Sequence, residues 1–222
     1  MDMDTIKRRV EKIRAEIPDH VEILAAAKTR SIEEVRTALD AGIRFFGHNY
    51  VQEAQAMLQE VDFDARWHLI GHLQRNKARF AVELFDMVET LDSVRLGKEL
   101  EKRCAAIGKT MPVLIEVNSG REENKAGVLP EEAIALAEWT SSQAHLKLAG
   151  LMTMGPLTGD PELARPYFVE TRRIFEEIKS MDLPATEMHI LSMGMSNSYR
   201  VAIEEGATLI RLGTALFGPR HG

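Results

Sequence analysis

The chain has 222 residues, a formal net charge of −6, 45% hydrophobic residues and 28% charged residues. This length suits one large α/β domain or two small ones, and an acidic balance without a basic run argues against nucleic-acid binding. The single cysteine, Cys104, excludes an internal disulfide and fits a helical core position. The lack of a long apolar stretch or a signal-peptide core predicts a cytoplasmic protein that does not enter a membrane.

The first part of the chain alternates helix and strand. The spacing of apolar residues predicts an amphipathic helix over 5–17. A near-continuous apolar run within 21–30 predicts a strand that is buried on both faces, with Lys28 at its carboxyl end. Ser31 and Glu34 form a capping box, which opens the next helix.

The same alternation continues to the end of the chain. Further strands are expected at Ile43–Gly47, Arg66–Gly71, Met87–Leu91, Pro112–Asn118, Leu148–Met154, Met188–Leu191 and Thr208–Leu212. Strands alternating with helices in this number are typical of an α/β (β/α)8 TIM barrel, here one domain over 1–222 with an extra N-terminal helix. The chain stops soon after the last strand, so that N-terminal helix is expected to cover the position of the eighth helix. A doubly wound open sheet is the alternative, although it usually has a glycine-rich first turn.

In a barrel, the carboxyl ends of the strands meet on one face, where active sites gather. The candidate site residues there are Lys28, Asn49, Gly194, Ser196, Arg211, Gly213 and Thr214. The glycines permit close approach and the hydroxyls donate to oxygen, so the segments after the last two strands suit a phosphate group. The alternative is that these residues only form tight turns and helix caps.

A lysine at this position is unusual, because burying an ammonium is costly unless it is paired or neutralised. Lys28 together with a phosphate site suggests a Schiff base with a phosphorylated aldehyde or ketone, as in pyridoxal 5′-phosphate (PLP) binding or a Schiff-base aldolase. Arg211 interrupts an apolar strand, and its guanidinium suits a pyridine nitrogen as acceptor. The alternatives are a solvent-facing Lys28 and a salt bridge from Arg211 to Glu116 or Glu89.

Three histidines raise the question of a metal. His48, His68 and His72 do not share one helical face, and no cysteine or carboxylate cluster completes a site. The sequence therefore predicts no metal site, and His68 is expected at the barrel mouth or in the core.

Several motifs together resemble the PLP homeostasis protein family, the single-domain relatives of the alanine racemase barrel. They are AAAKT at 25–29, FGHNYVQEA at 46–54, WHLIGHLQRNK at 67–77, SGREENKAG at 119–127, LSMGMS at 191–196 and IRLGTALFG at 210–218. The resemblance implies that Lys28 carries PLP and that Arg211 faces the pyridine nitrogen. It implies further that the phosphate is held by Ser196, Gly213 and Thr214, that Gly194 shapes the adjoining loop, and that Asn49 lies beside the cofactor. The chain departs from the family pattern at His48, commonly Glu, and at Asn197–Ser198, commonly Asp-Asp.

The resemblance implies a carrier and regulator of PLP that supplies apo-enzymes. We expect a monomer without strong catalytic activity. A PLP-dependent amino-acid racemase is the alternative function. Racemase chemistry needs a second acid/base, which two-domain racemases take from a tyrosine of a separate C-terminal domain. The chain ends directly after the barrel, and its tyrosines, Tyr50, Tyr167 and Tyr199, are expected in helices outside it. A protein-binding module would leave Lys28 and Arg211 unexplained.

Overall fold

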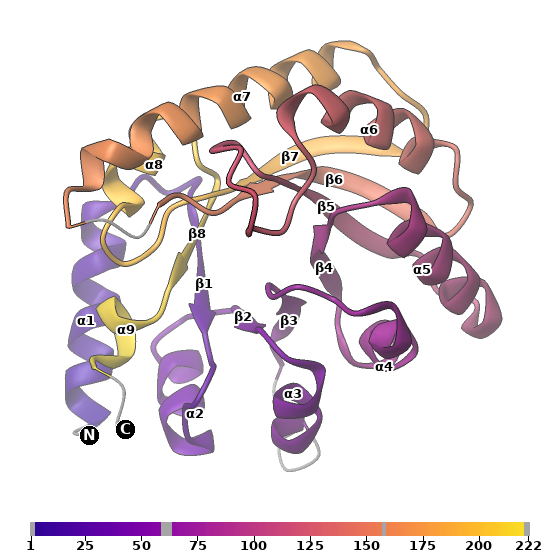
Figure 1. The fold of residues 1–222 in the computed structure, drawn as a ribbon. Coiled ribbons are helices and arrows are strands. Elements are labelled where there is room, and N and C mark those ends of the chain that lie inside the picture. The colour runs from indigo at the N-terminus through magenta and orange to yellow at the C-terminus, as the bar shows by residue number, and fades with distance from the viewer. Residues whose placement is uncertain (1–2, 59–63, 157–158, 220–222) are drawn as a thin grey trace.

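Eight parallel strands close into a barrel in the computed structural model, which describes residues 3–58, 64–156 and 159–219 (Figure 1). The strands follow chain order around the barrel, and β1 pairs with both β2 and β8. Their bounds are β1 Glu22–Ala26, β2 Phe45–His48, β3 Arg66–Leu69, β4 Met87–Leu91, β5 Met111–Val117, β6 Leu146–Thr153, β7 Thr186–Ser192 and β8 Leu209–Leu212. The predicted TIM-barrel fold is confirmed.

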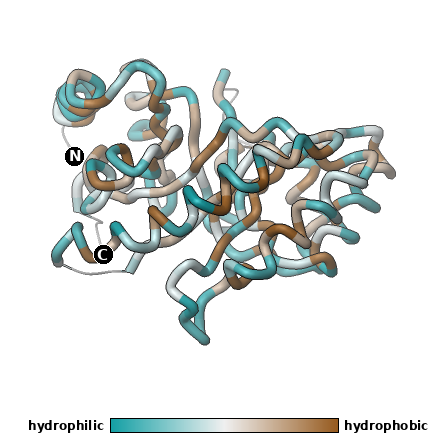
Figure 2. The backbone as a smooth tube through the Cα atoms, turned by 90° about the horizontal axis from the view of Figure 1, so that it is seen from above, coloured by the Kyte–Doolittle hydropathy of each residue, from teal (hydrophilic) through white to brown (hydrophobic). Residues whose placement is uncertain are grey.

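Helices cover the outside of the barrel (Figure 1). They are α1 Met3–Glu16, α2 Ile32–Asp40, α3 Val51–Leu58, α4 Ala78–Leu84, α5 Val94–Ile107, α6 Ala133–Ser141, α7 Arg165–Ser180, α8 Tyr199–Glu204 and α9 Thr214–Phe217. Teal and brown alternate along many of them in Figure 2, because a helix at the surface buries its apolar residues in the core and turns its polar residues to water. None of the helices in the described ranges is long and apolar enough to span a membrane.

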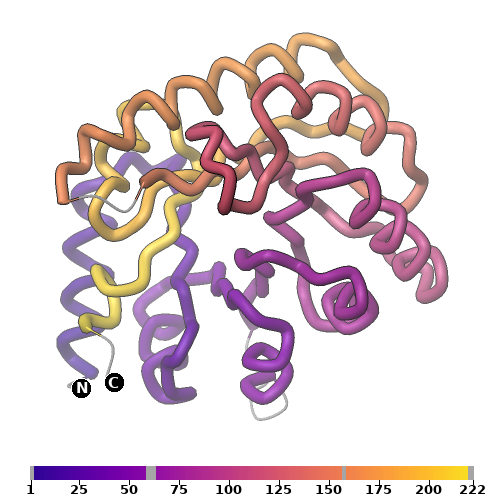
Figure 3. Tube along the Cα trace, in the orientation of Figure 1, coloured from indigo at the N-terminus to yellow at the C-terminus, as the bar shows by residue number. Residues whose placement is uncertain are grey.

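The N-terminal helix α1 occupies the position expected for an eighth barrel helix. Its apolar stripe of Ile6, Val10 and Ile13 is buried, as the sequence predicts. Figures 1 and 3 show the yellow α9 beside the indigo α1, and Arg9 Nη1 donates to the carbonyl of Leu216 at 3.4 Å. At its other end, α1 meets α8.

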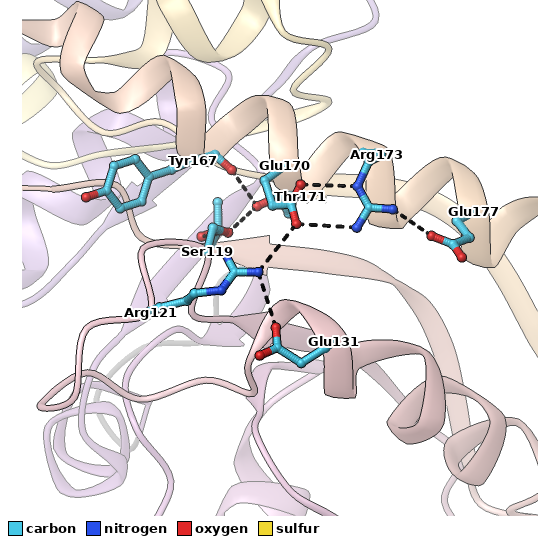
Figure 4. Close-up of polar contacts among 9 residues, drawn as sticks. Ser119, Arg121, Glu131, Tyr167, Glu170, Thr171, Arg173 and Glu177 are labelled. Carbon is cyan, nitrogen blue, oxygen red and sulfur yellow. Dashed lines mark hydrogen bonds and ion pairs between the residues drawn. The ribbon is translucent and has the colours of Figure 1, made fainter.

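The loop that follows β5, residues 118–127, is anchored on α7 (Figure 4). The buried hydroxyls of Ser119 and Thr171 lie 2.6 Å apart. Arg121 reaches outward to Glu131 at 3.2 Å and to Glu170 at 3.9 Å. Exposed ion pairs contribute little to stability, so the buried hydroxyl contact is the stronger anchor for this loop.

The structure also differs from the sequence prediction in a few elements. The strand β7 is longer than the predicted Met188–Leu191, and the short helix α9 was not expected at all. In β6, a Cβ atom on Gly150 would lie 1.8 Å from the carbonyl oxygen of Ile190. The two backbones approach so closely that only glycine fits, and the pairing of β6 with β7 shifts register there.

Candidate functional site

The carboxyl ends of the strands surround a cavity of about 420 Å³, the mouth cavity. It brings together five of the seven candidate residues from separate loops and strands: Asn49, Ser196, Arg211, Gly213 and Thr214. Ala26, Ile70, Met154, Pro156 and Met195 supply apolar wall. The cavity therefore combines apolar surface with a few convergent polar groups, as small-molecule sites do.

Lys28 lies next to this cavity without lining it. The strand β1 ends at Ala26, and Lys28 follows in a turn, where its side chain is half-buried. Its Nζ atom stands 4.8 Å from the ring centroid of Tyr50, a cation–π distance. Ala26 at the end of β1 and Asn49 in the loop after β2 both line the mouth cavity. Lys28 therefore has cavity residues both in its own segment and in the neighbouring loop.

The prediction for Tyr50 is wrong. Tyr50 precedes α3, which begins only at Val51, and its side chain is 53% exposed. It lines a second cavity, of about 290 Å³, together with Asn49 and Lys77. The apolar periodicity that marks α3 starts after Tyr50, so the residue belongs to the loop and faces Lys28. Tyr167 and Tyr199 lie in α7 and α8, as predicted.

The two segments that were expected to hold a phosphate are joined by one hydroxyl. The Oγ atom of Ser196 accepts hydrogen bonds from the backbone N–H groups of Gly213, at 3.3 Å, and Ala215, at 3.1 Å. Thr214 between them is exposed at the cavity. The hydroxyls of Ser196 and Thr214 therefore lie at one part of the cavity. Ser196 Oγ accepts from the two N–H groups, so its own proton is left to donate, and a hydroxyl is a donor that an anionic oxygen accepts from.

Gly194 shapes the loop after β7 rather than lining the cavity. Its φ is +91°, and a Cβ atom there would lie 2.5 Å from the Cβ of Ala202. Its carbonyl accepts from the backbone N–H of Arg211 at 3.0 Å. Both the backbone conformation and the packing against α8 thus require glycine.

Arg211 forms part of the cavity wall and is only 4% exposed. Its Nη1 donates to Ser192 Oγ at 2.7 Å, and its Nη2 donates to the carbonyl of Thr153 at 2.8 Å. Burial lowers the pKa of Arg211, while the charges of Glu89 and Glu116 oppose that effect. Among the described residues Arg211 forms no direct ion pair, so the salt bridge considered from the sequence is replaced by a link through Ser192.

Glu116 is a titratable group at the mouth that sequence reasoning considered only as a partner for Arg211. It lines a cavity of about 270 Å³ with Asn118 and Lys125, and Met154 lines both this cavity and the mouth cavity. Burial and then the charge of Asp92 raise its pKa to about 7. The alternation of β5 places Glu116 on the inward face, but alternation alone does not reveal this environment.

The three histidines lie in separate surroundings. His48 is buried and stacks on Trp67, with ring centroids 5.6 Å apart. His68 is a core residue, as predicted, and its Nδ1 lies 2.7 Å from Glu89 Oε1. His72 pairs with Asp92 at 3.1 Å. Within the described ranges, no three metal-ligating side chains form a group that could hold a metal ion.

Comparison with known proteins gives a consistent result. Residues 1–221 match the family described as alanine racemase, N-terminal domain. The chain is 41% identical over 202 residues to the pyridoxal phosphate homeostasis protein of Aquifex aeolicus. The aligned residues cover 89% of this chain and 86% of that protein. Two structures of PipY from Synechococcus elongatus also match 96% of this chain and all of PipY. The structure without PLP has a TM-score of 0.90 at 36% identity, and the one with PLP bound has a TM-score of 0.86 at 35% identity.

Proposed function

This chain belongs to the alanine racemase N-terminal domain family and, within it, to the pyridoxal phosphate homeostasis proteins, and from that premise we propose that it binds PLP through a Schiff base on Lys28. We propose further that residues 1–222 form one PLP-binding domain, which acts as a monomer in the cytoplasm. In that role the protein holds PLP reversibly, limits the free aldehyde and supplies apo forms of PLP-dependent enzymes.

The observation that carries this proposal is the mouth cavity with Lys28 beside it. Its volume of about 420 Å³ lies within the range of small-molecule sites, roughly 300–1,000 Å³. When bound, PLP supplies an aldehyde that condenses with a primary amine. Lys28 has the flexible four-carbon stem of a lysine, so its Nζ can turn from Tyr50 toward the cavity that Ala26 lines.

The polar groups of the cavity match the other two ends of such a cofactor. Ser196 and Thr214 offer hydroxyl donors for a phosphate, Gly213 leaves room for its close approach, and Gly194 sets the path of the loop. Arg211 and Asn49 both line the cavity, and in this proposal Arg211 faces the pyridine nitrogen and Asn49 lies beside the ring. An arginine remains protonated and gives the ring nitrogen a hydrogen bond rather than a proton, which makes the cofactor a weaker electron sink. This supports a carrier over an enzyme.

Glu116 favours a second candidate, a PLP-dependent amino-acid racemase. A carboxyl group with a pKa near 7 at the mouth has the properties of a general acid or base. Incubation of the PLP-loaded protein with single L-amino acids in D₂O tests this function. Deuterium at Cα that depends on both Lys28 and Glu116 would support the racemase, and its absence for every amino acid supports the carrier.

The absorbance spectrum of the purified protein tests the main proposal. We expect a PLP band near the violet edge of the spectrum in the wild type and its loss in Lys28→Ala. Lys77→Ala is the matched control, because Lys77 lines the adjoining cavity with Asn49 and should leave the band intact. Borohydride reduction followed by mass spectrometry locates the adduct, and a modified lysine other than Lys28 would overturn the assignment.

A further inference from the structure

Four buried polar side chains form a continuous hydrogen-bonded chain across the barrel interior. His68 Nδ1 lies 2.7 Å from one carboxyl oxygen of Glu89. The Ser192 hydroxyl lies 2.6 Å from the other carboxyl oxygen, and Arg211 Nη1 lies 2.7 Å from Ser192 Oγ. Since these residues come from β3, β4, β7 and β8, the chain ties opposite sides of the barrel to one point on the cavity wall.

The donors and acceptors in this chain fix the direction of its central bonds. A guanidinium has only donors, so Ser192 accepts from Arg211. The single hydroxyl proton of Ser192 is then donated to Glu89. Burial raises the pKa of Glu89, but hydrogen bonding and charge from His68, with Arg211 and Ser192 adding to them, outweigh burial and leave that pKa below its usual value. Glu89 is therefore a carboxylate, and it can only accept.

Arg211 and Glu89 thus form an ion pair that is bridged by a serine. A direct pair with a carboxylate takes two donors of the guanidinium side by side. The bridge takes one donor, while Nη2 is fixed by the Thr153 carbonyl. Two hydrogen bonds thus fix the guanidinium within the barrel. Glu89 compensates its charge without placing a carboxylate at the cavity wall, where a carboxylate would repel a phosphorylated ligand.

We propose that Glu89, acting through Ser192, is a positioning residue that sets the orientation and the charge balance of Arg211 toward the cofactor ring. This inference rests on the proposed function for its role in PLP binding. Glu89 does not line the mouth cavity, so its hydrogen bonds reach a bound cofactor only through Ser192 and Arg211, while its charge also acts through space.

The pH titration of the PLP band tests this role in the loaded protein. Glu89→Gln keeps the shape of the side chain and removes its charge, which leaves the positive charge of Arg211 uncompensated. The protonated Schiff base then becomes less favourable, and we expect the pH midpoint of the band to fall by about one unit. Ser192→Ala removes the bridging hydroxyl and leaves the charge of Glu89 in place, so it should shift the midpoint in the same direction by a smaller amount. In an Arg211→Met background the Ser192→Ala shift should vanish, and the Glu89→Gln shift should shrink to the through-space effect of the carboxylate charge.

Glu101→Gln is the matched control, because Glu101 also accepts from a histidine Nδ1, that of His145 at 2.8 Å, on the outside of the barrel. It should leave the midpoint at its wild-type value. An unchanged midpoint in both Glu89→Gln and Ser192→Ala would overturn the inference. A Ser192→Ala shift that persists in the Arg211→Met background, or a Glu89→Gln shift that keeps its full size there, would also overturn it, since these residues would then act without Arg211.

A second measurement on the protein without cofactor separates this inference from the proposed function. The guanidinium N–H groups of Arg211 are buried and hydrogen-bonded, so their ¹⁵N NMR signals should be visible through slow exchange in the wild type. We expect those signals to be lost or displaced in Glu89→Gln and Ser192→Ala and retained in Glu101→Gln. A wild type without a PLP band would refute the proposed function, whereas unchanged Arg211 signals would refute the positioning role.

Discussion

His48 and Glu116 are buried titratable side chains whose pKa values are displaced in opposite directions. Burial lowers the pKa of His48 from 6.5 to about 4. Burial, with the charge of Asp92, raises the pKa of Glu116 from 4.5 to about 7. Within the described residues, both ring nitrogens of His48 and the Oε2 atom of Glu116 are buried without a hydrogen-bond partner. The fold therefore favours the neutral form of each group.

The two groups contribute opposite pH dependences to stability. Between pH 6.5 and 4, His48 binds a proton in the unfolded chain but not in the folded protein. Acidification through this window therefore lowers the free energy of unfolding by about 3 kcal/mol. Between pH 4.5 and 7, the unfolded chain releases the Glu116 proton that the folded protein keeps, so raising the pH through this window removes a similar amount, about 3 kcal/mol. The windows overlap, and the two effects largely cancel.

Single substitutions should expose each effect. His48→Phe retains a ring against Trp67 and removes the acid-side loss, so its stability should fall more steeply than that of the wild type as the pH rises. Glu116→Gln should show the reverse, and the double variant should return toward the wild-type profile. Urea unfolding at intervals between pH 4 and 7 measures this. Exposed His20→Gln is the control, and a wild-type profile in both single variants would contradict the expectation.

Some site residues could be predicted from the sequence, and others could not. Lys28 and Arg211 stand out because each interrupts or ends an apolar strand, and the structure places Arg211 in the cavity wall. The bridge from Arg211 through Ser192 to Glu89 depends on which side chains meet across the barrel. Strand alternation gives the face on which a residue lies but not its partner on the opposite side, so this link required the structure.

At the scale of elements, the loop between β7 and α8 depends on one glycine. Gly194 has a φ of +91° and packs against Ala202, and it also accepts from the backbone of Arg211. Gly42 has a similar φ of +99° but has nothing within 4 Å of the position of a Cβ atom. The two glycines share a positive φ, which would strain any other residue, and they differ in the contact with a neighbouring element.

Gly194→Ala should therefore destabilise the protein more than Gly42→Ala. Both variants strain a left-handed residue, at a cost of about 1 kcal/mol, and Gly194→Ala adds a clash of about 1–3 kcal/mol with α8. Because the loop carries Ser196, Gly194→Ala should also weaken the retention of PLP, while Gly42→Ala should retain it. Urea midpoints and the PLP band measure the two effects. Equal losses in both variants would show that packing against α8 does not constrain this loop.

The elements that the sequence predicts best are those with a strong local signal. The strand β4 matches the predicted Met87–Leu91, and the capping box of Ser31 and Glu34 is present at the start of α2. The strand β7 begins earlier than predicted. The apolar pattern misses its start because Glu187 and His189 are exposed polar residues that interrupt the apolar run. The helix α9 has only four residues, too few for a periodic pattern.

At the scale of the whole molecule, α1 acts as part of the barrel wall and not as an appendage. It packs against α2 and α9, and Glu16 at its end accepts from the hydroxyl of Tyr199 at 3.1 Å. Ile6 is fully buried in the main core. A helix that joins the first and last segments of the chain in this way couples the closure of the barrel to its own docking.

This coupling predicts that a cavity in the α1 interface destabilises the whole barrel. Ile6→Ala should lower the free energy of unfolding by about 3 kcal/mol, whereas Lys12→Ala, on the face where the Lys12 side chain is 75% exposed, should change it by less than about 0.5 kcal/mol. Trp67 and Trp139 lie in β3 and α6, so their fluorescence reports on the barrel far from α1 along the chain. In Ile6→Ala, the fluorescence and far-ultraviolet circular dichroism transitions should move together to lower urea, as expected for a single cooperative domain. A tryptophan transition that stays at the wild-type midpoint while helix content is lost would mean that α1 unfolds alone and that the barrel closes without it.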